Sequence, residues 1–445
     1  MKPEGFDRFC FKSPGCGNRR GRRSRFFSVA FLAFVPRAEE ITMTARTFLA
    51  SVLGLAAFAV GATPAAAQIE KEFINPAGGY THVVTVKDRG VKTVYVSGQV
   101  GSGADLQAHA ESAFQGVAAQ LEAAGASMRD VVKIRIYVTE FDPEQYSLIS
   151  AARLAAFPED AWPVSTMLGI NALAREGLRV EIEATAVLAD PGADFELTRI
   201  GPSRGFSQAV VARHGAVKTI WVSGQTGRGD DLTAQTSFVF DRVSQRLADA
   251  GATMADVVKI NTYIVNFDPE QHMGQFGQGR ASVFGDNPPS STLLGIDRLV
   301  NDRIQIEVDA VAVVGASGRT ERLTREFLDR AGSFTQVVTV QGDGAKTIYV
   351  SGQVGRTSDP LETQAQQAFA GMKRRLEAAG ATPADLVKVI YYLPGYTPGN
   401  TGIAGAREAN AFPTDDLPAS TLLGIQSLYS TTALFEYEGI AVVQP

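Results

Sequence analysis

The sequence predicts an α+β fold in which one domain is repeated three times along the chain. Two observations predict the repetition: a segment ending in Val-Ser-Gly-Gln and a Pro-x-Ser-Thr segment each occur three times, in the same order. Inside each copy, β-branched runs alternate with amphipathic helical segments, which predicts mixed α and β structure. The copies lie much farther apart than the roughly 20 to 50 residues of solenoid units, so each copy is a whole domain.

Recurring segments place the copies along the chain. Turn-forming seams at Asp190–Asp194 and Gly315–Gly318 separate them. The predicted repeats therefore cover 68–190, 196–315 and 321–445. The recurring segments, including an Asp-(Val/Leu)-Val-Lys motif, lie at Val94–Gly101, Ile220–Gly227 and Ile348–Gly355; at Pro163–Ile170, Pro289–Ile296 and Pro418–Ile425; and at Asp130–Lys133, Asp256–Lys259 and Asp385–Lys388.

The first repeat shows the order of elements most clearly. Two β-branched runs, 83–86 and 93–97, flank a polar turn and predict a hairpin. A helix should follow, closed by Gly125 as its C-terminal cap. Strand 131–138, a helix over 143–157 and strands 164–170 and 178–188 complete the order β-β-α-β-α-β-β. The apolar face of the first helix consists of Leu106, Ala110, Ala113, Phe114, Val117 and Leu121.

Each repeat should leave one face of its sheet uncovered. Its two helices lie on one side, so a lone repeat would expose a large apolar surface and should associate. Three copies on one chain can bury these faces around a pseudo-threefold axis. We therefore expect a single-chain pseudo-trimer, that is, a monomer acting as an intramolecular trimer.

The N-terminal segment reads as a targeting signal. Residues 43–67 combine a basic start, an apolar run and Ala65-Ala66-Ala67 before Gln68, which is the order of a cleaved secretory signal peptide. We expect cleavage after Ala67 and a secreted or periplasmic protein. Residues 1–42 then precede the signal as an upstream extension, although a genuinely long leader is the alternative.

Composition excludes several kinds of function for the mature chain. Both cysteines lie in the extension, so thiol chemistry, disulfides and thiolate metal sites are ruled out, and we expect no metal or cofactor. The net charge is −5 for the whole chain and becomes more acidic without the Arg-rich leader, which disfavours nucleic-acid binding. No later stretch is apolar enough to span a membrane. The lone Gly101-Ser-Gly103 is most simply a turn.

The Ser-Gly-Gln segment, the Ala-Gly before Asp-Val-Val-Lys, and the final strand Val180–Val187 resemble the YjgF/RidA family of reactive-intermediate deaminases. The resemblance covers all three repeats. It implies a chorismate-mutase-like fold, trimers with ligand clefts between subunits, and cofactor-free hydrolysis of enamines and imines to keto acids. Ribonuclease activity, an older association of the family, gains no support from residues in this sequence.

The resemblance fails at one important position. Family deaminases bind the substrate carboxylate through an Arg two residues after the strand-opening Pro, and a serine stands there in each repeat. A hydroxyl cannot replace the forked, charged guanidinium. A threonine follows each serine, so each cleft should offer a Ser-Thr hydroxyl pair instead. These pairs are Ser165 and Thr166, Ser291 and Thr292, and Ser420 and Thr421.

Other family positions are retained. The glutamate of the last strand, implied to position or activate water, matches Glu181, Glu307 and Glu436; the alternative is an edge-strand side chain facing solvent. An aromatic position matches Tyr80, Phe206 and Phe334, so only the first repeat offers a phenol. The strand end whose backbone lines the cleft matches Ser97-Gly98, Ser223-Gly224 and Ser351-Gly352. A glycine needed for a bulge or a close backbone approach explains that pattern equally well.

Arg153, Arg280 and Arg407 recur on the second helix of each repeat and could restore the missing charge. As substitute anion clamps they would reach the clefts. A solvated helix face is the favoured interpretation, because recurring helical charges usually lie at the surface.

Two functions remain open from the sequence. The first is a cofactor-free hydrolase acting on small enamine or imine metabolites, which the three glutamates favour. The second is a non-catalytic protein that binds small metabolites in the clefts, which the missing arginine favours.

Overall fold

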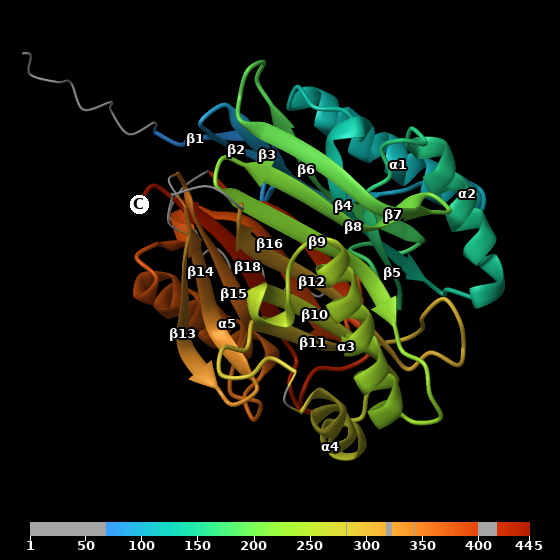
Figure 1. Cartoon of the computed structure of the whole chain (residues 1–445). Coiled ribbons are helices and arrows are strands. Elements are labelled where there is room, and N and C mark those ends of the chain that lie inside the picture. Colours follow the sequence, from blue (N-terminus) through green and yellow to red (C-terminus); the bar gives the residue numbers. More distant parts are fainter. Residues whose placement is uncertain (1–67, 282, 317–322, 343, 399–415) are drawn as a thin grey trace, which may run out of the picture. The chain divides into compact units, whose positions relative to one another are not determined.

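Strands and helices follow one another in the same order in repeats 1 and 2, and the described elements of repeat 3 keep that order (Figure 1). The computed structural model describes residues 68–281, 283–316, 323–342, 344–398 and 416–445; the predicted extension and signal peptide lie outside them. Repeat 1 contains β1 (Glu70–Pro76), β2 (Thr81–Asp88), β3 (Val91–Val100), α1 (Leu106–Ala123), β4 (Val131–Thr139), α2 (Tyr146–Ala156), β5 (Val164–Ile170) and β6 (Val180–Ala189). Repeat 2 contains β7 (Phe195–Ser203), β8 (Phe206–His214), β9 (Val217–Thr226), α3 (Leu232–Asp249), β10 (Val257–Val265), α4 (Pro269–Arg280), β11 (Ser290–Ile296) and β12 (Ile306–Gly315). Repeat 3 contains β13 (Thr324–Ala331), β14 (Phe334–Gln341), β15 (Lys346–Val354), α5 (Leu361–Ala378), β16 (Leu386–Pro394), β17 (Ala419–Ile425) and β18 (Glu436–Val443).

The predicted α+β class and the three tandem domains are confirmed, and each repeat adds one element to the predicted order. Strands β1, β7 and β13 precede the predicted hairpin, so every repeat opens with three strands before its first helix. In β1 exposed residues alternate with half-buried ones, because it pairs with β2 alone at the edge of the sheet. Such a strand carries few apolar residues, and its periodicity is therefore weak in the sequence.

Local sequence accounts for the first helix and its ends. The six apolar residues predicted for one face of α1 are all buried in the core of repeat 1. Asp105 caps the N-terminus, because its side chain accepts a hydrogen bond from the Ala108 amide at 2.9 Å. Gly125 adopts φ +70° just beyond the C-terminus, as predicted for a glycine cap.

The six strands of each repeat have the same order, which in repeat 1 is β1-β2-β3-β6-β4-β5. A single parallel pairing of Ala419 in β17 with Thr81 in β2 joins the six-stranded sheets of repeats 3 and 1 into one sheet of twelve strands. Within repeat 1, neighbouring strands are antiparallel except β4 and β5, which are parallel. In β6, Val180, Ile182 and Ala184 pack under the helices, while Glu181 and Glu183 alternate onto the opposite face. The chemistry-bearing residues of the last strand therefore face away from the core of their own repeat.

The uncovered faces of the three sheets pack against one another within one compact unit. One apolar cluster draws Tyr137 and Leu168 from repeat 1, Tyr263 from repeat 2, and Tyr392 and Leu423 from repeat 3. Further clusters join the repeats in pairs. These contacts bury the surface that the sequence predicted to be apolar, and they are consistent with the expected pseudo-trimer.

The same hydrogen bonds recur where consecutive repeats meet. The amide of Ser207 in repeat 2 donates to the carbonyl oxygen of Pro163 in repeat 1 at 2.8 Å. Equivalent bonds run from repeat 3 to repeat 2 and from repeat 1 to repeat 3. They join Thr335 N to Pro289 O at 3.0 Å and Thr81 N to Pro418 O at 3.2 Å.

Candidate active site

A cavity of about 850 Å³ lies where repeat 1 meets repeat 2. Repeat 1 contributes α2 and β5, and repeat 2 contributes β8, β9, α3 and β12. Among the residues that line it are Arg153, Ser165, Phe206, Gly224 and Glu307. The structure thus brings together in one cleft one residue from each of the five recurring positions that the sequence singled out.

Glu307 presents a buried carboxyl group to this cleft and is only 4 % exposed. Burial, helped by the nearby charge of Asp309, raises its pKa to about 8. Burial likewise raises the pKa of Glu181 and of Glu436 to about 8. The alternative of a solvent-facing glutamate is therefore wrong for all three, and at neutral pH each carboxyl group is mostly protonated.

The glycine of each Ser-Gly pair makes room for the glutamate. A Cβ atom on Gly224 would lie 1.7 Å from Oε1 of Glu307. Gly98 and Gly352 have the same relation to Glu181 and Glu436, at 1.6 and 1.5 Å. The β3–β6 register also shifts next to Gly98, so both expected reasons for glycine, a bulge and a close approach, apply.

Each serine of the Ser-Gly pair joins two repeats. Ser223 is fully buried; its hydroxyl donates to the Ser207 carbonyl oxygen at 2.6 Å and accepts from the Ser165 amide at 2.9 Å. Ser97 and Ser351 make the same pair of bonds, with the amides of Ser420 and Ser291 as donors. These hydroxyls hold the cleft walls together, and their single donor hydrogen is already used in a bond to the protein.

Arg153 reaches the cleft from α2, and the expectation of a solvated helix face is wrong for it. Its side chain is 3 % exposed, and Nη1 donates to the Ser165 hydroxyl at 3.2 Å. Nη2 donates to the Tyr146 hydroxyl and to the Arg204 carbonyl oxygen, both at 3.3 Å. The guanidinium lies 5.1 Å from the centre of the Phe206 ring. A guanidinium from another element thus touches Ser165, the position at which the resemblance implied an arginine.

Arg280 in repeat 2 is buried in the same way. It donates to the Ser333 carbonyl oxygen at 2.8 Å and packs on Phe276 and Phe284. Burial lowers its pKa to about 10. Arg407, the third member of the series, lies outside the described residues.

The predicted Ser-Thr hydroxyl pair is divided between two faces of the strand. Ser165 borders the cleft, whereas Thr166 is 1 % exposed and donates to Asp309 at 3.4 Å. Thr292 donates to Glu438, and Thr421 donates to Glu183 at 2.8 Å. Because successive side chains of a strand alternate, the three threonines belong to a central polar network and not to the clefts. Ser291 and Ser420 are half-buried at the positions equivalent to Ser165.

The aromatic position differs among the repeats. Phe206 lies under Arg153 in the cleft between repeats 1 and 2. Phe334 occupies the equivalent start of β14 and is half-buried. Tyr80 stands there in repeat 1, with its hydroxyl 3.5 Å from Nε2 of His82 and the two rings packed edge to face. The interfaces therefore differ in chemistry.

Positive charge surrounds the cleft. Arg228, Arg242 and Arg303 line it in addition to Arg153, whereas the acidic side chains that line it are Asp230 and the largely protonated Glu307. A small ligand that carries a carboxylate is therefore favoured over a neutral or cationic one. Within the described ranges, no group of three or more acidic, His or Cys side chains is arranged to hold a metal ion.

Comparison with known sequences shows which protein family the chain belongs to. The Endoribonuclease L-PSP family matches residues 70–188, 196–314 and 324–443. The chain belongs to this family, also known as YjgF/RidA. It is 33 % identical over 120 residues to a 2-iminobutanoate/2-iminopropanoate deaminase from Dermatophagoides farinae, a match that covers 25 % of this chain and 88 % of that protein.

Solved RidA-family structures resemble single repeats of the chain. A YjgF/YER057c/UK114 family member from Mycobacterium tuberculosis is 32 % identical, with a TM-score of 0.24, over 27 % of this chain and all of that one. RidA from the Antarctic bacterium Psychrobacter sp. PAMC 21119 is also 32 % identical, with a TM-score of 0.23, over 25 % of this chain and 93 % of that one.

Several residues of this RidA-family cleft were not found from the sequence. Tyr146, which holds Arg153, and the arginines at 242 and 303 occur in one repeat only, so repetition gives no signal for them. Arg228 recurs as Arg356 in repeat 3, but Ser102 stands at that position in repeat 1. The partners of the central threonines did carry a signal. The lysine of the Asp-(Val/Leu)-Val-Lys motif and the acidic residue two places after the cleft glutamate recur in every repeat. In the described part of this family member, no helix is long and apolar enough to cross a membrane.

Proposed function

We propose that the protein is a cofactor-free hydrolase that deaminates small enamine or imine metabolites bearing a carboxylate, in the cleft between repeats 1 and 2. One observation carries the proposal: the buried Glu307 carboxyl group and the buried Arg153 guanidinium line the same cavity, although they come from different repeats. The name of the mite relative, an imino-acid deaminase, supports the substrate class.

Arg153 would take the role of the missing arginine. Ser165, Tyr146 and the Arg204 carbonyl oxygen hold three of its N–H groups, and Nε has no hydrogen-bond partner among the described residues. A buried cation with a free donor favours a carboxylate ligand. Bound there, the carboxylate would fix the imine carbon within the cleft that Glu307 lines.

A single carboxyl group can move every proton of the reaction. Protonated Glu307 donates to the imine nitrogen, or to the β-carbon of an enamine, and becomes a carboxylate. The carboxylate then accepts a proton from a water molecule while the water oxygen bonds to the imine carbon, and the product is a carbinolamine. Glu307 then protonates the nitrogen and recovers the hydroxyl proton as the C–N bond breaks. Ammonia and a keto acid leave, and Glu307 is protonated again.

Ammonia release tests the proposal. The mature protein is supplied with imino acids formed in place from several amino acids, beside a Glu181→Gln/Glu307→Gln/Glu436→Gln variant and the control Glu122→Gln, whose side chain is exposed on α1. We expect turnover that the triple variant lowers by roughly 10²- to 10⁴-fold and the control leaves unchanged. Arg153→Met should raise KM more than Arg153→Lys.

The alternative is a binding protein whose clefts hold metabolites without reaction. The serine in place of the family's arginine favours a binding protein, because Arg153 already donates three hydrogen bonds to protein atoms and has fewer left for a substrate. Saturable binding of keto or imino acids that needs Arg153, without ammonia release from any substrate, would establish this function and exclude the hydrolase.

A further inference from the structure

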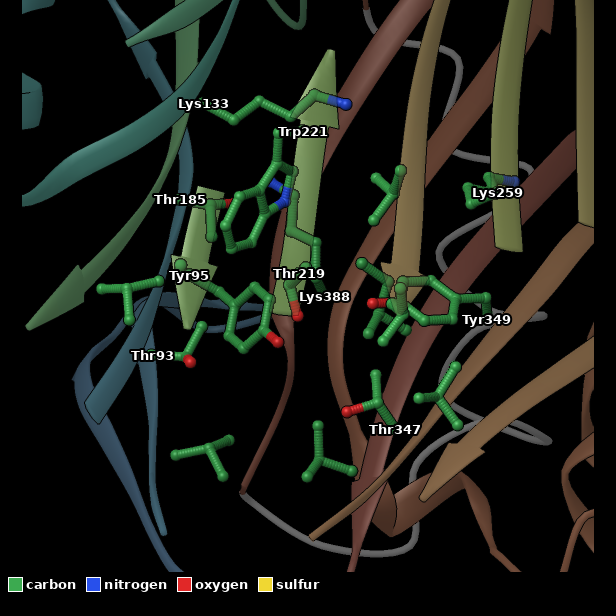
Figure 2. A pocket seen from close by; sticks show the side chains of 18 of the residues that line it. Thr93, Tyr95, Lys133, Thr185, Thr219, Trp221, Lys259, Thr347, Tyr349 and Lys388 are labelled. Atoms are coloured by element: carbon green, nitrogen blue, oxygen red, sulfur yellow. The ribbon is translucent and has the colours of Figure 1, made fainter. Parts of the chain in front are cut away.

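A second cavity, of about 220 Å³, lies at the centre of the three repeats and is separate from the cleft (Figure 2). Its walls come from β3, β9 and β15 and from the last strands of the repeats. Equivalent residues form layers: Thr93, Thr219 and Thr347 lie beneath the aromatic side chains Tyr95, Trp221 and Tyr349 in Figure 2. The layers arise because residues two apart in a strand face the same side.

Charged side chains line part of this cavity. Lysines from the Asp-(Val/Leu)-Val-Lys motif pair with an acidic residue of another repeat. Lys133 pairs with Asp309 at 2.8 Å, Lys388 pairs with Glu183 at 2.8 Å, and Lys259 pairs with Glu438. The three ion pairs therefore link repeat 1 to 2, repeat 2 to 3 and repeat 3 to 1.

Arg135 adds a fourth cation to this network. It donates to Asp309 at 2.9 Å through Nε, to Glu183 at 3.2 Å, and to the Asn261 side chain at 2.7 Å. Asn261 and Ile390 occupy the equivalent strand positions, so no other repeat supplies a matching charge. Four cations thus face three carboxylates in a buried site, which leaves one positive charge without a partner charge.

Lys133 is the cation with free donors. Lys259 donates to Thr292 at 2.9 Å and to the Val350 carbonyl oxygen at 3.4 Å in addition to its ion pair, and Lys388 makes the equivalent bonds. Lys133 makes only the bond to Asp309 among the described residues. Burial, reinforced by the charge of Arg135, lowers the pKa of Lys133. An anion beside Lys133 would accept hydrogen bonds from the ammonium donors that Asp309 leaves unused.

Aromatic rings and free hydroxyls define the rest of the ligand. Tyr95 and Tyr349 are buried, and their hydroxyl groups have no hydrogen-bond partner in the part of the chain that the structure describes. With Trp221 they line the cavity together with the lysines and the threonines (Figure 2). A cavity of about 150 Å³ holds benzene, so this one has room for a substituted ring.

We infer that the central cavity is a binding site for a small aromatic monocarboxylate, whose carboxylate lies beside Lys133 and whose ring packs between Tyr95, Trp221 and Tyr349. The single negative charge balances the network, and the ring fills the aromatic layer. Asp88 and Arg89 also border the cavity but pair with each other at 3.4 Å, so they add no net charge. The site is independent of the proposed hydrolase.

Trp221 provides the test. Trp162 is the other tryptophan of the sequence, so Trp162→Phe leaves Trp221 as the single reporter. Benzoate should change its fluorescence in a saturable manner. Acetate, which lacks the ring, and benzamide, which lacks the charge, should bind at least tenfold more weakly. Equal binding of acetate or benzamide would overturn the assigned ligand class.

Variants locate the bound benzoate. Lys133→Met should weaken binding at least tenfold, and Lys133→Arg should retain it. Thr219→Phe, which fills the cavity without touching the charges, should abolish binding and keep the chain folded by circular dichroism. Absence of saturable benzoate binding to the parent, or binding that survives Lys133→Met and is lost in Arg153→Met, would overturn the inference, the latter by placing benzoate in the cleft.

Discussion

Glu181, Glu307 and Glu436 hold their carboxyl groups away from water, against the backbone of a glycine. Burial is the largest cause of the raised pKa in each case. A proton therefore binds more tightly to these groups in the folded chain than in the unfolded chain, so they stabilise the fold most at low pH. The same property makes a carboxyl group able to donate and recover a proton near neutral pH.

The pH dependence of stability should show these three groups directly. Their contribution is complete below pH of about 4.5 and is lost as the pH rises through about 8. The triple Glu→Gln variant, which cannot ionise, should gain stability relative to the parent between pH 5 and pH 8. At about 1.4 kcal/mol per pKa unit, the gain is several kcal/mol at most per group.

Urea unfolding at the two pH values measures this difference. The exposed Glu122→Gln variant is the control and should follow the parent at both. A free-energy difference between parent and triple variant that stays constant from pH 5 to pH 8 would show that the carboxyl groups are not protonated in the folded state.

Cleft residues that recur in all three repeats could be predicted from the sequence. The side chains that each of them contacts could not. The glutamates, the aromatic position and the Ser-Gly pairs could be placed from the sequence. The burial of Arg153 does not follow from the helix pattern, because it depends on Tyr146 in the same helix and on Arg204 in the next repeat. The sequence predicts Thr166 in the cleft beside Ser165, but successive side chains of a strand point to opposite faces, so Thr166 contacts Asp309 instead.

Among the elements, the strands that carry Ser-Gly-Gln link the fold to the cleft. Strand β9 pairs with β12, and their register shifts between Val308 and Ala310. The serine of this strand fastens the neighbouring repeat, and the glycine gives the glutamate its place. A side chain in place of this glycine should therefore displace the cleft glutamate and leave the packing of the hydrophobic core largely unchanged.

Gly224→Ala tests this element. Its Cβ would overlap the Glu307 carboxyl group, so we expect a loss of about 1–3 kcal/mol in the free energy of unfolding. Gly274→Ala is the matched control, because Gly274 lies in α4 with no atom near its would-be Cβ, and it should gain about 0.5–1 kcal/mol. The Glu307→Ser substitution should recover most of the loss caused by Gly224→Ala; two additive losses would contradict the account.

Prediction of the elements failed mainly at the sheet edge. The inner strands and α1 follow from β-branched runs and from helical spacing, and they lie where the sequence placed them. Strand β1 alternates glutamates with few apolar residues, and its pairing with β2 comes from the partner strand and not from its own composition. The first turn of the predicted second helix is a separate 3₁₀ turn, Pro143–Gln145.

At the scale of the whole molecule, equivalent contacts recur between repeats 1 and 2, 2 and 3, and 3 and 1. They include the serine hydroxyl bonds at the cleft walls and the ion pairs around Arg135. Repetition of whole domains predicted that the sheets would associate. The residues of the central ion pairs recur in every repeat, but recurrence alone does not show that each lysine pairs with the acidic residue of another repeat. The proposed cleft requires residues from two repeats, so it exists only if the repeats close on one another.

Sedimentation velocity of residues 68–445 tests this closure most directly. We predict a single species with the mass of one chain and a compact frictional ratio, unchanged as the protein concentration rises. A chain whose repeats are separate along the polypeptide would instead sediment as an extended monomer, or would assemble into larger species with concentration. Either result would contradict the account and remove the shared cleft.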